Sequence, residues 1–187
     1  AAIYAQQDDM SKSLAVQLLA KGEGYVTESR DLTRVAQMFM VEGLPHRGAA
    51  VMRQGLEDGM IEETEQAYQT FSDTLLQSRE WELALEPLGQ AAELHKDGSL
   101  YVRQAQVNLQ LGRWADARSS LNLAFEKGDL VDEGQAHILF GIAAANDKKW
   151  NTAVSAFGRA GKFEGTRTVA GKWIAYVKRE QVRLSGE

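Results

Sequence analysis

The sequence predicts an all-α fold, a right-handed superhelical α-solenoid built from helix hairpins. Three observations favour it. Tryptophan recurs at Trp81, Trp114 and Trp150, spaced 33 and 36 residues apart. Small residues recur at fixed distances from each tryptophan, and no stretch shows the sustained apolar-polar alternation of a strand. Repetition at a period of about 20–50 residues is typical of solenoids and related arrays.

The residues around each tryptophan keep one pattern of sizes. Alanine stands three and ten positions after each tryptophan, and a large apolar residue stands between these two alanines. A small residue stands nine positions before the tryptophan. The small positions are Ser72, Ala84, Ala91, Ala105, Ala117, Ala124, Gly141, Ala153 and Ala160, and the large ones are Leu88, Leu121 and Phe157. A step of 36 residues toward the N-terminus predicts small Ala36, Gly48 and Gly55 and large Met52, as found. These spacings put the residues on one helix face, where helices pack closely.

Each repeat is predicted to form a helix, a tight turn and a second helix. The expected helices cover 29–42, 45–58, 62–78, 80–95, 98–111, 114–127, 132–146, 149–160 and 166–184, with two more at 1–7 and 9–21. Gly112 lies in one turn and is free to take a positive φ, whereas the next turn, Asp147-Lys148-Lys149, shows that glycine is not required. Pro87 falls inside a predicted helix and is expected to kink it.

These elements give a single domain over 1–187. It contains a partial repeat at 1–24, repeats at about 29–60, 62–96, 98–130 and 132–164, and a C-terminal capping helix at 166–184. Val169, Trp173 and Val177 form the predicted inner stripe of that helix, and basic residues back it, as a solenoid end requires. Because Ala1 lies 35 residues before Ala36, we expect the chain to be the C-terminal part of a longer protein.

A period of about 34 residues with this small and aromatic pattern resembles the tetratricopeptide repeat (TPR), and the resemblance extends over the whole chain. The third repeat departs most from the family pattern, because Gln104 and Asn108 stand where apolar residues are expected. The terminal proline of the family is missing from every repeat. In the first helix of each repeat, the family has a large residue near the start and another large residue later. The first of these positions is filled by Leu32, Tyr68, Tyr101 and His137, and the second by Phe39, Leu75, Asn108 and Ala144.

Composition excludes several classes of function. The chain has 21 basic and 26 acidic residues, a net charge of −5, which argues against a nucleic-acid binder. It contains no cysteine, so thiol catalysis, disulfides and thiolate metal sites are absent. The longest apolar run without charge, 138–145, is far shorter than the roughly 20 residues that a membrane span needs. We therefore expect no direct membrane insertion.

Catalytic and metal-binding patterns are not found either. His46, His95 and His137 share no helix face, and their spacing to carboxylates predicts no metal site. Most of the acidic pairs lie at predicted helix starts, where negative charge is favoured. Gly22-Glu23-Gly24 lacks the third glycine of a dinucleotide fingerprint, and no Gly-x-Ser-x-Gly sequence is present. The sequence predicts a protein that is not an enzyme, with no catalytic residue, cofactor or metal.

The family resemblance implies a concave groove, lined by the first helix of each repeat, that binds a protein or peptide partner. Amides there can pair with the backbone of a bound strand, and arginines can pair with carboxylates; the alternative is that these are ordinary solvated residues. The clamp with which some TPR domains hold acidic chaperone tails is not predicted, because only Arg103 fits it. The predicted groove residues are Arg34, Gln37, Gln69, Asp73, Arg103, Gln106, Ile142 and Asn146.

A narrower resemblance concerns TPR proteins associated with bacterial TonB systems. It is carried by Glu-Gly-Leu-Pro at 42–45, Arg-Glu-Trp-Glu at 79–82, Leu-Gly-Arg-Trp at 111–114 and GKWIAYVKRE at 171–180. It implies an accessory, non-catalytic scaffold of an energy-transducing nutrient-uptake system in the bacterial periplasm or cell envelope, with a TonB-complex component as partner. The alternatives are a structural module that forms a homodimer or larger oligomer, and a general adaptor of envelope assembly.

Overall fold

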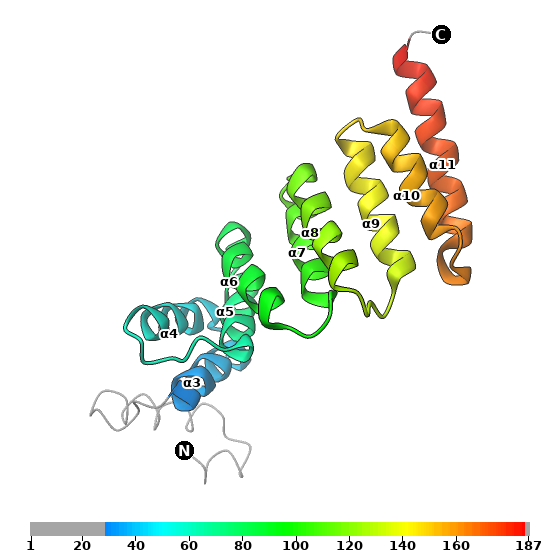
Figure 1. The fold of residues 1–187 in the computed structure, drawn as a ribbon. Helices are drawn as coiled ribbons and strands as arrows, with labels where there is room; N and C mark the ends of the chain where they lie inside the picture. Colours follow the sequence, from blue (N-terminus) through cyan, green and yellow to red (C-terminus); the bar gives the residue numbers. More distant parts are fainter. Residues whose placement is uncertain (1–28, 186–187) are drawn as a thin grey trace. The chain divides into compact units, whose positions relative to one another are not determined.

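The computed structural model describes residues 29–185, which form an N-terminal unit at 29–94 and a C-terminal unit at 95–185. Every regular element in this range is a helix (Figure 1). The N-terminal unit contains α3 (Ser29–Val41), α4 (Pro45–Glu57), α5 (Glu65–Gln77) and α6 (Trp81–Leu94). The C-terminal unit contains α7 (Ser99–Gln110), α8 (Trp114–Lys127), α9 (Glu133–Asn146), α10 (Trp150–Ala160) and α11 (Glu164–Ser185). The helices expected at 1–7 and 9–21, and the partial repeat at 1–24, lie outside the described residues.

Within each unit the helices pack as consecutive hairpins. The pairs are α3 with α4, α5 with α6, α7 with α8, and α9 with α10. The first helix of a hairpin also packs against both helices of the hairpin before it: α5 contacts α3 and α4, and α9 contacts α7 and α8. The last helix, α11, contacts α9 and α10 in the same way, so it occupies the place of a further first helix (Figure 1). None of the helices in 29–185 is both long enough and apolar enough to span a membrane.

One turn geometry closes all four hairpins. The second residue after the first helix has a positive φ in each case, and it is Gly43, Arg79, Gly112 or Lys148. The next N–H then donates to a carbonyl five residues earlier, which satisfies a carbonyl that the helix end leaves free. These bonds run from Leu44 to Phe39 (2.8 Å), Glu80 to Leu75 (2.9 Å), Arg113 to Asn108 (2.8 Å) and Lys149 to Ala144 (2.8 Å). The prediction that glycine is used at Gly112 but is not required is confirmed.

The predicted small and large positions form the helix interfaces. Every alanine of the pattern, together with Met52, Leu88, Leu121 and Phe157, is fully buried. The glycines show why small residues are needed: a Cβ added to Gly48 would lie 2.8 Å from the Ala36 carbonyl oxygen, and one added to Gly141 would lie 2.5 Å from the Phe157 ring. The interfaces therefore close to distances that larger side chains would prevent.

The capping helix differs from the prediction in its register. Val169 is not part of the inner stripe, because its side chain is 45% exposed, whereas Ala170 and Val177 are buried. The start of α11 explains this rotation. Thr166 is buried, and its Oγ1 donates to the Ala160 carbonyl at 2.6 Å. This bond turns the face containing 166, 170 and 177 toward α10, so Val169 lies to one side of that face.

Candidate functional site

Each unit has a cavity that opens along its first helices. In the N-terminal unit a cavity of about 780 Å³ lies between α3 and α5. It contains two of the predicted groove residues, Arg34 and Gln37. Its lining is mostly polar and comprises Ser29, Arg30, Thr33, Arg34, Gln37, Gly59, Met60, Glu62, Thr64, Gln66 and Ala67.

The amides of this unit are partly engaged within the protein. The Nε2 of Gln37 donates to Thr70 Oγ1 at 3.4 Å, a contact that joins α3 to α5. The Nε2 of Gln69 donates to Glu65 Oε1 at 2.7 Å, one turn earlier on its own helix. Gln69 and Asp73 are half-buried and do not line the cavity. The predicted groove residues of α3 therefore share this cavity, and those of α5 lie outside it.

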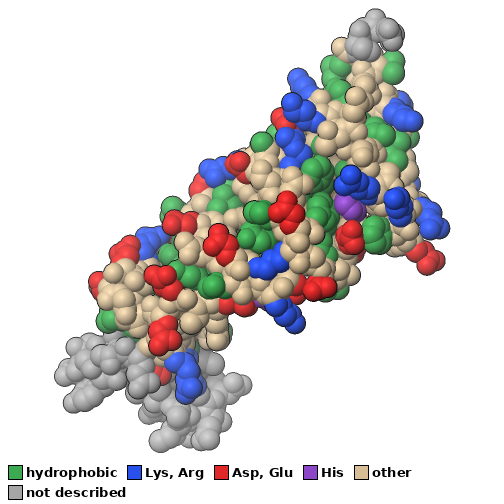
Figure 2. Space-filling model, viewed as in Figure 1, with side chains coloured by type: hydrophobic (Ala, Val, Ile, Leu, Met, Phe, Trp, Pro, Cys, Tyr) green, Lys and Arg blue, Asp and Glu red, His purple; other side chains and the backbone are tan. Residues whose placement is uncertain are grey.

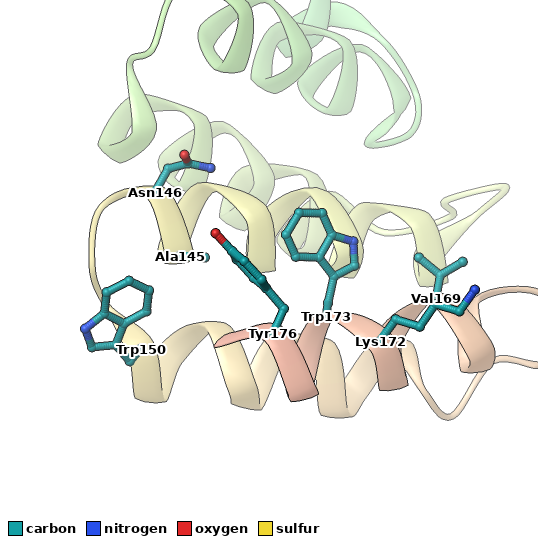
Figure 3. A pocket seen from close by; sticks show the side chains of 7 residues that line it. All are labelled: Ala145, Asn146, Trp150, Val169, Lys172, Trp173 and Tyr176. Atoms are coloured by element: carbon teal, nitrogen blue, oxygen red, sulfur yellow. The ribbon is translucent and has the colours of Figure 1, made fainter. Parts of the chain in front are cut away.

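In the C-terminal unit a cavity of about 430 Å³ lies where α9, α10 and α11 meet. Asn146 is the predicted groove residue that lines it. Ile142, one turn earlier, packs against the hydrophobic core beside it. Arg103 and Gln106, on α7, lie outside this cavity. The lining residues are Ala145, Asn146, Trp150, Val169, Lys172, Trp173 and Tyr176 (Figure 3).

The aromatic wall of this second cavity is fixed from behind. The ring of Trp173 stacks on Phe157, with centroids 5.5 Å apart and an angle of 7° between the planes. Tyr176 meets Trp173 edge-on at 5.7 Å and 84°. Phe157 is fully buried, so Trp173 rests on a rigid support, whereas Tyr176 is 44% exposed. A wall of this kind buries an apolar group of a ligand without first having to become ordered.

Two polar side chains stand at the edges of this cavity. The Nδ2 of Asn146 donates to the Ile142 carbonyl at 2.9 Å, which leaves its side-chain oxygen able to accept a hydrogen bond. Lys172 is exposed and forms no ion pair with any residue that the structure describes. The cavity thus combines apolar walls with one acceptor and one cation, the arrangement by which pockets orient a bound ligand.

Sequence reasoning identified Asn146 but missed Trp150, Lys172, Trp173 and Tyr176. The fixed spacing of Trp150 and the place of Trp173 in the predicted inner stripe are both typical of core residues, but the two side chains are half-buried. Each packs on one side and lines the cavity on the other. A signal was present, because GKWIAYVKRE at 171–180 places Lys172, Trp173 and Tyr176 within five positions. Such a basic and aromatic cluster is unusual for a helix that only closes a core.

The buried histidine has a packing role, as its repeat position predicts. The imidazole of His137 stacks on Phe125 with the ring centroids 4.4 Å apart. Burial lowers the pKa of His137 below its ordinary value, and the charges of Arg159 and Lys162 act in the same direction, against the effect of Glu133. The ring is therefore neutral at pH 7, as suits a side chain packed against an aromatic ring.

No group of three or more His, Cys, Asp or Glu side chains in the described ranges is arranged to hold a metal ion. His95 lies 3.3 Å from Asp97, and His137 lies 3.5 Å from Glu133. Neither pair has a third histidine or carboxylate beside it in the described residues to complete a metal site. Within 29–185, the two cavities along the first helices are the ones that contain predicted groove residues. Two further cavities, of about 490 Å³ and 290 Å³, lie against the second helices and contain none of those residues.

Comparison with known proteins identifies the fold. No family model and no curated protein matches the chain. Among solved structures, MamA superposes with a TM-score of 0.67 at 16% identity, covering 88% of this chain and 94% of that one. YrrB, described as a TPR protein with an unusual peptide-binding site, gives 0.65 at 17% identity, covering 85% of this chain and 80% of that one.

A third similar structure is the C-terminal part of a TPR repeat-containing protein from Cytophaga hutchinsonii. Its TM-score is 0.68 at 12% identity, and the match covers 96% of this chain and 69% of that one. These levels of identity establish the fold and leave the function to be argued from the site. The chain has the all-α fold of tetratricopeptide-repeat proteins.

Proposed function

We propose that this chain is a non-catalytic scaffold that binds a protein or peptide partner along its first helices. The observation that carries the proposal is the cavity between α9, α10 and α11. Its aromatic wall is held in place by Phe157 and stays open to solvent at Tyr176, which is 44% exposed. Soluble proteins bury aromatic side chains where they can, and an open aromatic pocket is typical of a binding site.

Two further observations support a binding role. The cavity of the N-terminal unit also opens on first helices, so both units have an open site on the same element of the repeat. One structure of the same fold, YrrB, is described as having a peptide-binding site. Protein binding is the use to which stacked helix hairpins are best suited, because their first helices present adjacent rows of side chains.

The finer proposal is that the partner belongs to a TonB energy-transduction system in the bacterial periplasm or cell envelope. It rests on the resemblance carried by the segments 42–45, 79–82, 111–114 and 171–180. The last of these segments includes Lys172, Trp173 and Tyr176, which line the cavity. If the resemblance reflects a shared partner, that partner contacts this cavity.

Site-specific photo-cross-linking tests both levels of the proposal. A benzophenone amino acid replaces Tyr176 in the cavity or, as a control, Leu123 on the second helix α8, which is comparably exposed at 43%. The purified variants are irradiated in an extract of a bacterial envelope, and mass spectrometry identifies the products. We expect a discrete protein to be linked through position 176 and not through position 123.

The identity of the product separates the alternatives. A TonB, ExbB or ExbD protein supports the finer proposal, whereas a different discrete protein supports the scaffold and contradicts the TonB assignment. A product made of two copies of this chain would favour the oligomerisation module. Equal labelling from both positions, or none, would contradict a binding role for the cavity.

A further inference from the structure

The last part of the described chain, residues 148–185, is basic although the protein as a whole is acidic. It contains nine Lys and Arg and two Asp and Glu, a net charge of +7, in a chain whose total is −5. The remainder of the chain therefore carries −12. In Figure 2, blue side chains outnumber red ones over the end formed by α10 and α11. A basic segment in an otherwise acidic chain attracts an acidic partner to that segment.

Most of these cations are not neutralised by the protein itself. Arg183 pairs with Glu180 at 2.6 Å. The other eight form no ion pair with any residue that the structure describes. The nearest preceding acid, Asp147, is already engaged by Arg118 at 2.7 Å. The basic segment thus has charge available for a ligand.

The aromatic cavity lies within this basic segment. Five of its seven lining residues belong to 148–185. Figure 3 shows Trp173 and Tyr176 projecting from α11 toward α9, with Trp150 at one end of the cavity and Lys172 beside Val169 at the other. A ligand with an apolar group between the rings therefore meets a cation at the other end of the same cavity.

We propose that this cavity binds an acidic peptide segment, with one apolar side chain of the peptide between Trp150 and the Trp173–Tyr176 wall and a neighbouring carboxylate on Lys172. The proposal rests on the scaffold function above and specifies the chemistry of the partner. The apolar side chain supplies burial, and the carboxylate supplies a charge-assisted hydrogen bond. The remaining cations attract further acidic residues of the same segment and accelerate association.

The geometry favours a peptide over the other acidic ligands. Nucleic-acid bases stack on free aromatic faces, but Trp173 is stacked on Phe157 and meets Tyr176 edge-on. An anionic membrane surface is met by aromatic side chains that project outward, whereas these rings line a recess of about 430 Å³. A recess of this size takes a side chain.

The four tryptophans of the chain provide a test that locates binding. Their indole N–H signals, assigned with Trp→Phe variants, are followed by ¹⁵N NMR of the purified chain. The probe is the synthetic peptide Glu-Asp-Glu-Leu-Phe-Glu-Asp-Glu. We expect the signals of Trp150 and Trp173 to shift with saturation and those of Trp81 and Trp114 to stay in place.

Three matched peptides and two matched variants define the chemistry. Replacing Leu-Phe by Ser-Ser tests the apolar side chain, replacing every acid by Lys tests the charge, and scrambling the order tests the spacing. Lys172→Glu is compared with Lys178→Glu, an equal change of charge on the same helix outside the cavity. We expect Lys172→Glu to weaken binding by about fivefold or more, and Lys178→Glu to have a smaller effect through long-range charge alone.

Several outcomes would overturn the proposal. These are equal binding of the Lys peptide, equal losses in the two variants, and shifts confined to Trp81 or Trp114. The same holds if single-stranded DNA or phosphatidylglycerol vesicles shift Trp150 and Trp173 at lower concentrations than the peptide does, or if those signals shift with protein concentration alone, which would indicate a second copy. No peptide binding refutes the acidic-peptide chemistry and leaves the scaffold to the cross-linking result, which does not depend on this probe.

Discussion

The hairpins α5–α6 and α7–α8 have the same turn and have small residues at the same interface positions, but they differ in polarity at three interior positions. In α5–α6 three adjoining positions are apolar, and in α7–α8 the residues 33 positions later are polar. The positions are Phe71, Leu75 and Pro87 in the first hairpin and Gln104, Asn108 and Ser120 in the second. Leu75 is fully buried, and its counterpart Asn108 is only 4% exposed.

The polar side chains form a short chain of hydrogen bonds that is not complete. The Oγ of Ser120 donates to Gln104 Oε1 at 2.8 Å, and the Nδ2 of Asn108 donates to Ser120 Oγ at 3.4 Å. The Oδ1 of Asn108 is buried without a partner in the described part of the chain. The small residues and the turn therefore specify the hairpin, since three interior positions are apolar in one hairpin and polar in the other and the fold is the same.

The largest expected effect follows from placing the polar residue of α7 at the matching apolar position of α5. Leu75→Asn should destabilise the protein by about 3–5 kcal/mol, because the amide would be buried without partners and a cavity would be left beside it. Leu75 packs with Ala49, Ala84 and Phe71, none of which offers a side-chain hydrogen bond. Urea unfolding followed by circular dichroism measures the change. Leu75→Met serves as a volume-matched control, and a loss equal to that control would mean that polarity has no role.

A second prediction extends the comparison to α9–α10. Residues 16 apart pair a small with a large side chain in every hairpin, and only here is the small one glycine and the large one phenylalanine, at Gly141 and Phe157. Gly141→Ala should cost about 1–3 kcal/mol, because its Cβ would lie 2.5 Å from the Phe157 ring.

The double variant Gly141→Ala, Phe157→Leu reproduces the pair found in α7–α8, Ala105 with Leu121. The added methyl group then occupies space that the ring vacates, so part of the loss should return. Additive losses in the double-mutant cycle, measured by urea unfolding, would show that the two sizes are not coupled.

The polar hairpin yields the opposite prediction. Asn108→Leu should stabilise the protein by about 1–2 kcal/mol, because it removes the buried, unpaired Oδ1 and places at 108 the apolar residue found at the matching position 75. The Ser120 hydroxyl keeps its donor bond to Gln104, so no new unpaired group is created. The shift of the urea midpoint at constant slope measures the gain. Ser120→Ala is the control and should be destabilising, because it removes a hydrogen-bond partner of both Gln104 and Asn108. A loss of stability in Asn108→Leu would contradict the prediction and show that the hydrogen bonds among Gln104, Asn108 and Ser120 stabilise the hairpin.

The fold was predictable because its determinants are repeated. Ala84, Ala117 and Ala153 stand at the same offset and are all buried, so each repeat is an independent reading of one pattern. The departure at Gln104 and Asn108 was visible in the sequence. Its consequence was not, because Ser120, which bonds to both, lies on the partner helix at a position where the pattern sets no size.

The candidate site was less predictable because binding residues do not repeat. Arg34 and Gln37 lie in the cavity of the N-terminal unit, and Asn146 lies in that of the C-terminal unit. The aromatic wall depends on the rotation of α11, which Thr166 sets through its bond to Ala160. The repeat pattern does not predict that hydrogen bond, because Thr166 has no counterpart in the pattern.

The smallest expected effect concerns the turns, where the two hairpins again differ by one residue. Arg79 and Gly112 occupy the same position with φ of 62° and 70°. A residue with a Cβ is strained there, whereas glycine is not, although glycine loses more chain entropy on folding. Arg79→Gly should therefore stabilise α5–α6 by about 0.5–1 kcal/mol, and Gly112→Ala should destabilise α7–α8 by a similar amount. If neither change altered the free energy of unfolding in urea, the helix packing would impose the turn geometry, and the turn itself would contribute nothing to the stability of the hairpin. The shared hairpin geometry would then rest on the small interface residues alone.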